Sequence, residues 1–82
     1  MRVAISSGKS GHDLAQAAAE GYDLFLTGEP EEESVYVARE LGIHFVAAGH
    51  YATERLGVQA LAARLADRFG VAWEFVEVAN PV

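Results

Sequence analysis

The chain has 82 residues, of which 51% are hydrophobic, and this allows one domain with a single modest core. Its 12 acidic residues outweigh 6 basic ones, and the net charge of -6 argues against nucleic acid and anionic membranes as partners. The sequence contains no cysteine, which excludes disulfides and thiolate metal sites and leaves His, Asp and Glu as the strong metal ligands. The apolar stretch near the N-terminus is too short for a signal peptide or a membrane span, so we expect a cytoplasmic protein.

The first part of the chain alternates a strand, a helix and a second strand. Residues 3–5 form a short apolar run, and Ser10 followed three residues later by Asp13 resembles a capping box. These residues predict an alanine-rich helix from about residue 12 to 20, ended by a glycine. The apolar run at 24–26 has the length of a buried strand.

A second helix is predicted after Pro30, which suits a first helical turn. The three glutamates at 31–33 add negative charge where the helix dipole favours it, and we interpret them as a solvated face. Gly42 is a typical left-handed C-terminal residue and marks the end of this helix. The positions expected to face the core are Val35, Ala38 and Leu41 or their neighbours.

The last part of the chain predicts a strand, a long helix and a final strand. The strand covers residues 43–48, and the helix from about residue 51 to 69 ends at Gly70. Residues 71–81 mix glutamates with apolar residues and are interpreted as an edge or partly exposed strand. The apolar positions that recur at helical spacing in the long helix are Ala60, Leu61, Leu65 and Phe69.

The predicted order is β-α-β-α-β-α-β, which indicates an α/β layered fold with a mostly parallel or mixed sheet flanked by helices. We expect residues 1–82 to form a single domain. Ligands of such sheets usually bind beyond the carboxyl ends of the strands. Small, polar or ionisable residues follow each predicted strand at that edge, namely Ser6, Ser7, Gly8, Thr27, Gly28, Glu29, Gly49, His50 and Asn80.

The segment "SSGKSG" invites comparison with a phosphate-binding loop, because Gly8-Lys9-Ser10 matches the end of that motif. The first glycine of the motif is replaced by Val3, so the nucleotide motif fails. Two interpretations stay open for this segment: a purely structural turn, which is favoured, and an anion site formed by free backbone N–H groups.

The segment "AGHYATERLG" places His50 and Glu54 four residues apart at the start of a helix. An imidazole and a carboxylate on one face of a helical turn can reach the same cation. This spacing also arises often by chance, and from the residues alone the favoured interpretation is a histidine near a helix start and a solvated glutamate. Two interpretations stay open for Glu29, which comes directly after a buried strand: a carboxylate that faces the same crevice and one that faces solvent. We expect His44 to be a packing histidine and His12 an exposed residue at a helix start, with no ligand role for either.

Three segments together resemble a known family: "DLFLTGE", "GIHFVAAGHYATERLGVQALAARL" and "FVEVANPV". They are similar to the C-terminal part of the dinuclear metal-centre family of GTP cyclohydrolase I type 2 homologues, the Nif3-like proteins. The resemblance covers nearly the whole chain, and its G-H-Y-A-T-E element is specific. It implies that residues 1–82 correspond to the C-terminal part of a longer family fold.

The resemblance also implies roles for individual residues. His50 and Glu54 match family metal ligands, with zinc, iron or manganese as the metal. Glu29 and Glu54 become the candidate catalytic residues, and Glu29 the best candidate for a supporting role beside the metal. The implied substrate pocket is lined by Ser7, Gly8, Thr27, Gly28 and Glu29. The family's remaining ligands, two histidines and an aspartate, come from an N-terminal part with no counterpart here.

Three functions follow from these observations. The first is a partial metal site of a metal-dependent hydrolase acting on a small molecule, nucleotide-like or phosphorylated, and incomplete in this chain alone. The second is a non-enzymatic α/β module that self-associates or docks a partner and keeps a residual metal pair; because so small a sheet leaves a core face exposed, we expect a homo-oligomer. The weakest is a nucleotide-binding domain built on "SGKSG".

Overall fold

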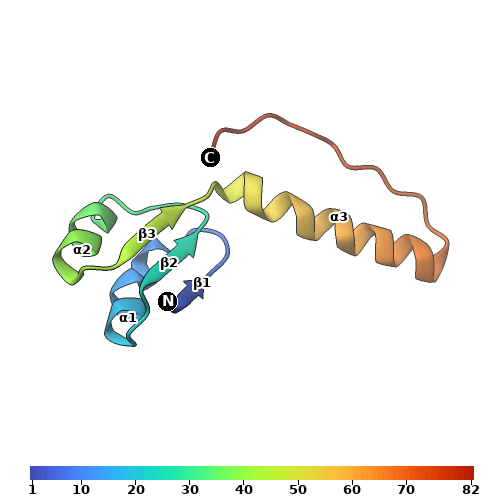
Figure 1. The fold of residues 1–82 in the computed structure, drawn as a ribbon. Coiled ribbons are helices and arrows are strands. Elements are labelled where there is room, and N and C mark those ends of the chain that lie inside the picture. The colour runs from blue at the N-terminus through green and yellow to red at the C-terminus, as the bar shows by residue number, and fades with distance from the viewer.

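The computed structural model describes residues 1–82 and shows an α/β fold with a parallel sheet of three strands (Figure 1). This confirms the predicted fold class. In chain order the elements are β1 (Val3–Ile5), the 3-10 turn η1 (Gly11–Asp13), α1 (Leu14–Ala19), β2 (Leu24–Thr27), α2 (Ser34–Leu41), β3 (His44–Ala47) and α3 (His50–Phe69).

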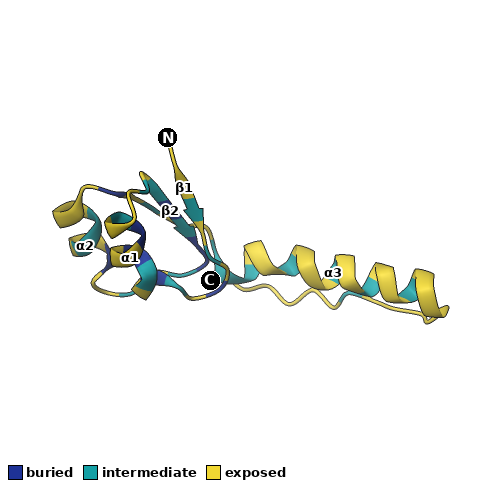
Figure 2. Cartoon of the chain, turned by 90° about the horizontal axis from the view of Figure 1, so that it is seen from below, coloured by how far each residue is buried: buried dark blue, intermediate teal, exposed yellow.

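The strands lie in the order β1-β2-β3, so β2 is central and both neighbours pair with it in parallel. The register places Ala4 beside Phe25 and Phe25 beside Phe45, all on the face that packs against α1 and α2. The Phe25 and Phe45 rings stack with their centroids 6.1 Å apart. Both short helices therefore cover one face of the sheet (Figure 2).

The core is small and lies between this face and the two helices. Its buried apolar residues are Leu14, Ala17, Phe25 and Ile43. From α2, Val37 and Ala38 pack against this core, whereas Val35 and Leu41 are exposed. Of the expected core positions of α2, only Ala38 packs against the core, and Val37, a neighbour of the expected positions, packs there as well. A helix this short contacts the core along a narrow stripe.

The opposite face of the sheet is not covered by any helix. In a strand successive side chains point to opposite faces, so Ile5 and Val46 lie on the face away from the core, and both are exposed. His44 lies on this face and is also exposed. The expectation that His44 is a packing histidine is therefore wrong. His12 is exposed, as predicted.

The predicted capping box before the first helix is also wrong. The Ser10 side chain makes no cap hydrogen bond; its hydroxyl donates to the Ser7 carbonyl at 3.0 Å and lies 2.9 Å from the Ser6 hydroxyl. The chain instead enters α1 through the 3-10 turn η1. The predicted ends of α2 and α3 are confirmed, because Gly42 and Gly70 have left-handed φ values of 67° and 66°.

The long helix α3 leaves the edge of the sheet and projects away from it (Figures 1 and 2). None of its 20 residues is buried, and the apolar Leu61, Leu65 and Phe69 are exposed. The helical spacing of these residues correctly predicts the helix. It does not place their apolar side chains in the core of this chain.

The predicted final strand is absent. Residues 70–82 have no regular secondary structure and run back along α3 toward its first turn (Figure 1). A helix of this length carries the chain about 30 Å from the sheet, so the returning segment meets the side of α3 and no strand edge. Arg55 of α3 pairs with Glu77 of the tail at 2.8 Å and stacks on Phe75 at 5.4 Å.

Candidate metal site at the start of helix α3

The carboxyl ends of the three strands lie at one edge of the sheet, and the loops that follow them are bound to one another. The carbonyl oxygen of Gly8 accepts three hydrogen bonds, from the Gly28 and Glu29 amides at 2.9 and 3.1 Å and from the Thr27 hydroxyl at 3.1 Å. Thr27 is 1% exposed, so its hydroxyl makes this hydrogen bond from a buried position. These bonds fix the loop after β1 against the loop after β2.

Gly28 permits the closest approach at this edge. A Cβ atom at this position would lie 2.5 Å from the Gly8 carbonyl oxygen and 2.8 Å from the His50 Cα atom. Both neighbours are backbone atoms, which cannot move aside as a flexible side chain can. The absence of a side chain at Gly28 therefore lets the loop after β1 and the start of α3 meet at the end of β2.

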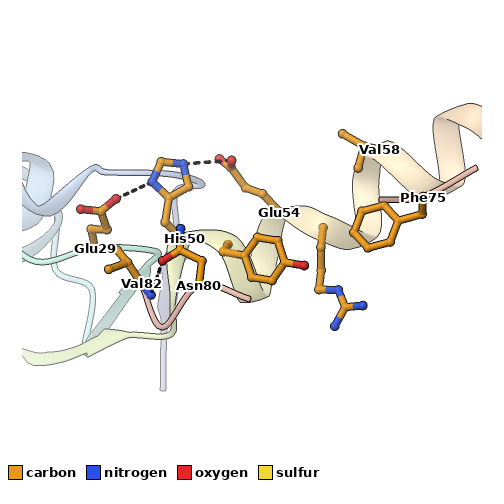
Figure 3. Close-up of a pocket in the computed structure, with 9 residues that line it drawn as sticks. Glu29, His50, Glu54, Val58, Phe75, Asn80 and Val82 are labelled. Carbon is orange, nitrogen blue, oxygen red and sulfur yellow. Dashed lines mark hydrogen bonds and ion pairs between the residues drawn. The ribbon is translucent and has the colours of Figure 1, made fainter. Parts of the chain in front are cut away.

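His50 is the first residue of α3, and its imidazole lies between two carboxylates (Figure 3). Its Nδ1 atom is 2.6 Å from Glu29 Oε1, and its Nε2 atom is 2.9 Å from Glu54 Oε2. Glu29 comes from the loop after β2, whereas Glu54 is one turn further along α3. The structure thus brings together the three residues that the sequence singled out.

The two carboxylates change the protonation of this histidine. The hydrogen bond to Glu29 is the largest cause and raises the pKa of His50 above its ordinary value of 6.5. Partial burial opposes this by lowering the pKa, and the charge of Glu54 raises it further. The two carboxylates therefore favour the protonated form of this imidazole more than water does for a free histidine.

His50 Nε2 and Glu54 are the groups at this edge that could hold a divalent cation. Metal–ligand bonds of about 2.0–2.2 Å place two ligand atoms on one cation about 3 Å apart, close to the 2.9 Å separation of these atoms. Glu29 would then hold Nδ1–H, the usual arrangement that orients a metal-binding histidine. The structure contains no group of three or more His, Asp or Glu side chains able to hold a metal. The residues present therefore fit one part of a metal site.

Gly8 is buried and lies close against this pair. A Cβ atom at Gly8 would lie 3.2 Å from Glu54 Oε1 and 3.7 Å from His50 Nε2. Gly8 also has a φ of 76°, in the region that favours glycine. Of the other predicted pocket residues, Ser7 is exposed and Gly28 is buried under the loops.

A pocket of about 390 Å³ opens beside the histidine. It is lined by Glu29, His50, Tyr51, Glu54, Arg55, Val58, Phe75, Asn80 and Val82. The tail forms one wall, because the Tyr51 amide donates to the Val82 carbonyl at 2.8 Å. Sequence reasoning missed Phe75 and Val82 as pocket residues, since it assigned the tail to the sheet. Asn80 was placed at this edge, although by way of a strand that does not form.

Comparison with known proteins identifies the family. The model of the Duf34/NIF3 (NGG1p interacting factor 3) family matches residues 1–81. The chain belongs to this family. The resemblance that the sequence motifs indicate is thereby confirmed.

Several relatives in this family carry the name GTP cyclohydrolase 1 type 2 homolog. The protein of Allochromatium vinosum is 52% identical over 80 residues, and that of Pseudomonas aeruginosa is 49% identical over 80 residues. Each match covers 98% of this chain and 32% of the relative. The chain therefore spans about a third of the length of these relatives.

Two solved structures share the backbone of this chain. Protein ybgI, from structural genomics and described as of unknown function, has a TM-score of 0.90 at 41% identity, over 98% of this chain and 32% of its own. TTHA1606 from Thermus thermophilus has a TM-score of 0.83 at 38% identity, over 95% of this chain and 31% of its own.

No helix of the chain has the length and apolar character that crossing a membrane requires.

Proposed function

We propose that this chain carries part of the metal site of a metal-dependent hydrolase of the family. The observation that carries the proposal is the position of His50 between Glu29 and Glu54, at 2.6 and 2.9 Å. His50 Nε2 and Glu54 would bind a divalent cation, with zinc, iron and manganese as the candidates. With two ligands, this chain alone would bind the cation weakly and be inactive.

The cation would supply Lewis acidity at the pocket, which favours attack by water at neutral pH. The residues of the chain would perform the remaining tasks. Glu29 would accept a hydrogen bond from Nδ1–H of His50 and so hold Nε2 toward the cation. Either Glu29 or Glu54 would transfer a proton during the reaction, because both carboxylates line the pocket.

The proposed substrate is a small molecule, nucleotide-like or phosphorylated. A pocket of about 390 Å³ lies at the lower end of the range for small-molecule sites. The name of the relatives, GTP cyclohydrolase 1 type 2 homolog, supports a nucleotide-like substrate. A homo-oligomeric state and a cytoplasmic location stay predictions.

Isothermal titration calorimetry with zinc, manganese and iron(II) tests the metal proposal on the chain itself. We expect weak binding that is reduced about tenfold or more in His50→Ala, since one of two ligands is removed. The matched control is His12→Ala, because His12 is an exposed histidine outside the site. Equal binding by the chain and by His50→Ala would contradict the proposal.

A further inference from the structure

Asn80 lies near the end of the tail and lines the pocket that also contains the three candidate site residues (Figure 3). Contacts between the tail and α3 hold it there. The Tyr51 amide donates to the Val82 carbonyl at 2.8 Å, and Arg55 pairs with Glu77 at 2.8 Å. These two contacts keep the end of the tail beside the candidate metal pair.

The side chain of Asn80 is oriented by a hydrogen bond within the tail. The Val82 N–H donates to Asn80 Oδ1 at 3.0 Å, across Pro81. A backbone N–H can only donate, so the atom that it meets is the amide oxygen and the NH₂ group is the other atom. Pro81 stiffens this turn, because its ring fixes its own φ and restricts the residue before it. Asn80 is exposed, so its NH₂ group is a donor that a ligand can use.

The charged groups of the pocket favour an uncharged ligand. Arg55 is the only Arg or Lys that lines the pocket, and its guanidinium is already paired with Glu77. Glu29 contacts His50 through Oε1 and Glu54 contacts it through Oε2, which leaves one further oxygen on each carboxylate. A phosphate group would be repelled by these carboxylates, whereas an uncharged N–H donor would be accepted by them.

An amide group matches this set of contacts. It carries one acceptor oxygen and one N–H donor, and both need a partner when the amide leaves water. The Asn80 NH₂ group would donate to the amide oxygen, and the remaining oxygen of Glu29 or Glu54 would accept from the amide N–H. Val58 and Phe75 provide apolar walls for the carbon atoms of the ligand.

We propose that Asn80 is a substrate-binding residue that selects a small molecule with an uncharged amide group, such as a ring amide. This inference rests on the proposed function, because it takes this pocket as the substrate pocket. It adds the chemical group of the substrate that lies beside Asn80. A phosphate group of the same substrate would lie away from Asn80.

The sequence makes a direct NMR experiment possible. Asn80 is the only asparagine, and Gln16 and Gln59 are the only glutamines, so three side-chain amides give separate ¹H–¹⁵N signals. The ring amide pyrrolidone is titrated into the ¹⁵N-labelled chain with a chelator present. We expect a saturable shift of the Asn80 NH₂ signals with a Kd on the order of 10 mM, as for other ligands of this size. The Gln16 and Gln59 signals should not move, because neither residue lines the pocket.

Two further ligands separate the contacts. Cyclopentanone keeps the ring and the carbonyl group but lacks the N–H, so it should bind about threefold or more weakly than pyrrolidone. Inorganic phosphate should leave the Asn80 signals in place, because the carboxylates repel it.

The variant Asn80→Asp keeps the oxygen that accepts from Val82 and removes the NH₂ group. Its affinity for pyrrolidone, followed at the Tyr51 backbone amide, should fall about tenfold or more. The matched control is Gln16→Glu, which makes the same amide-to-carboxylate change on α1, outside the pocket. Its affinity should equal that of the chain.

Four results would overturn the proposal. The absence of an Asn80 shift with pyrrolidone, or equal affinities of the chain and Asn80→Asp, would contradict the role of Asn80. A shift with phosphate alone would contradict the amide class, and equal binding of cyclopentanone would contradict the carboxylate contact. The chelator keeps metal out of this experiment, so a failed zinc titration would leave its result intact. Failure here would in turn leave zinc binding by His50 standing.

Discussion

His50 touches Glu29 and Glu54 through different ring nitrogens, and this division of contacts gives the two carboxylates different tasks. Glu29→Gln should weaken divalent metal binding by about 10- to 100-fold, because an amide holds the Nδ1 proton less strongly than a carboxylate. Calorimetry with zinc measures the change. Glu31→Gln is the control, as Glu31 lies outside the pocket, and an equal loss in both variants would contradict a specific role for Glu29.

The same hydrogen bond predicts a pH dependence of the metal-free chain. Because the pKa of His50 is raised in the folded chain, its contribution to the free energy of unfolding is present below the unfolded value of about 6.5. This contribution is lost as the pH rises through the folded value. The difference in Tm between the chain and His50→Gln, measured with a chelator present, should be larger at about pH 6 than at about pH 9. A difference that grows with pH would contradict the assigned contacts.

Gly28 and Gly57 form a matched pair for testing the junction of the loops. Gly28→Ala places a Cβ atom 2.5 Å from a backbone oxygen and should destabilise the chain by about 2–4 kcal/mol. Gly57 lies inside α3, and an added Cβ would meet no atom within 4 Å apart from its chain neighbours and the backbone of the same helix. Gly57→Ala should therefore stabilise the chain by about 0.5–1 kcal/mol. Denaturant unfolding of both variants measures these changes, and equal stabilities would contradict the close approach.

At the level of elements, the three strands of the sheet and the helix ends could be predicted from local signals, whereas the choice of His50 and Glu54 as a metal pair needed the family resemblance. The apolar runs at β1 and β2, and Gly42 and Gly70 after their helices, depend on residues close in sequence. The prediction of a strand at residues 71–81 required a neighbouring strand with which this segment could pair. The periodicity of a sequence carries no information about which edge of a sheet, if any, a segment reaches. The local pattern of a strand was present, but the tail meets the side of α3 and stays without a strand partner.

The central strand and the long helix should differ in how firmly their backbone amides are protected. Strand β2 is central and contains the buried Phe25 and Thr27, whereas α3 has no buried residue. Amide hydrogens of α3 should therefore exchange at least about tenfold faster than those of β2 in the chain alone. Hydrogen exchange followed by mass spectrometry measures both. Similar protection of α3 and β2 would indicate that α3 is already packed against a partner.

At the level of the whole molecule, the sequence predicted an exposed core face but could not show which face it is. That choice follows from α1 and α2 lying on the same side of the sheet, which is a property of the three-dimensional arrangement. The proposed metal site with only two ligands and the uncovered sheet face have the same explanation in our account. Both belong to a fold of which the chain spans about a third.

The central claim is that His50 binds a divalent cation through Nε2 while Glu29 holds Nδ1–H. Titration of zinc into the ¹⁵N-labelled chain, followed by long-range ¹H–¹⁵N NMR of the imidazoles, tests it directly, because the chain has only 3 histidines. We expect the Nε2 resonance of His50 to shift toward the value of a metal-bound nitrogen while Nδ1 stays protonated. Zinc-induced shifts at His12 or His44 with none at His50 would contradict the account.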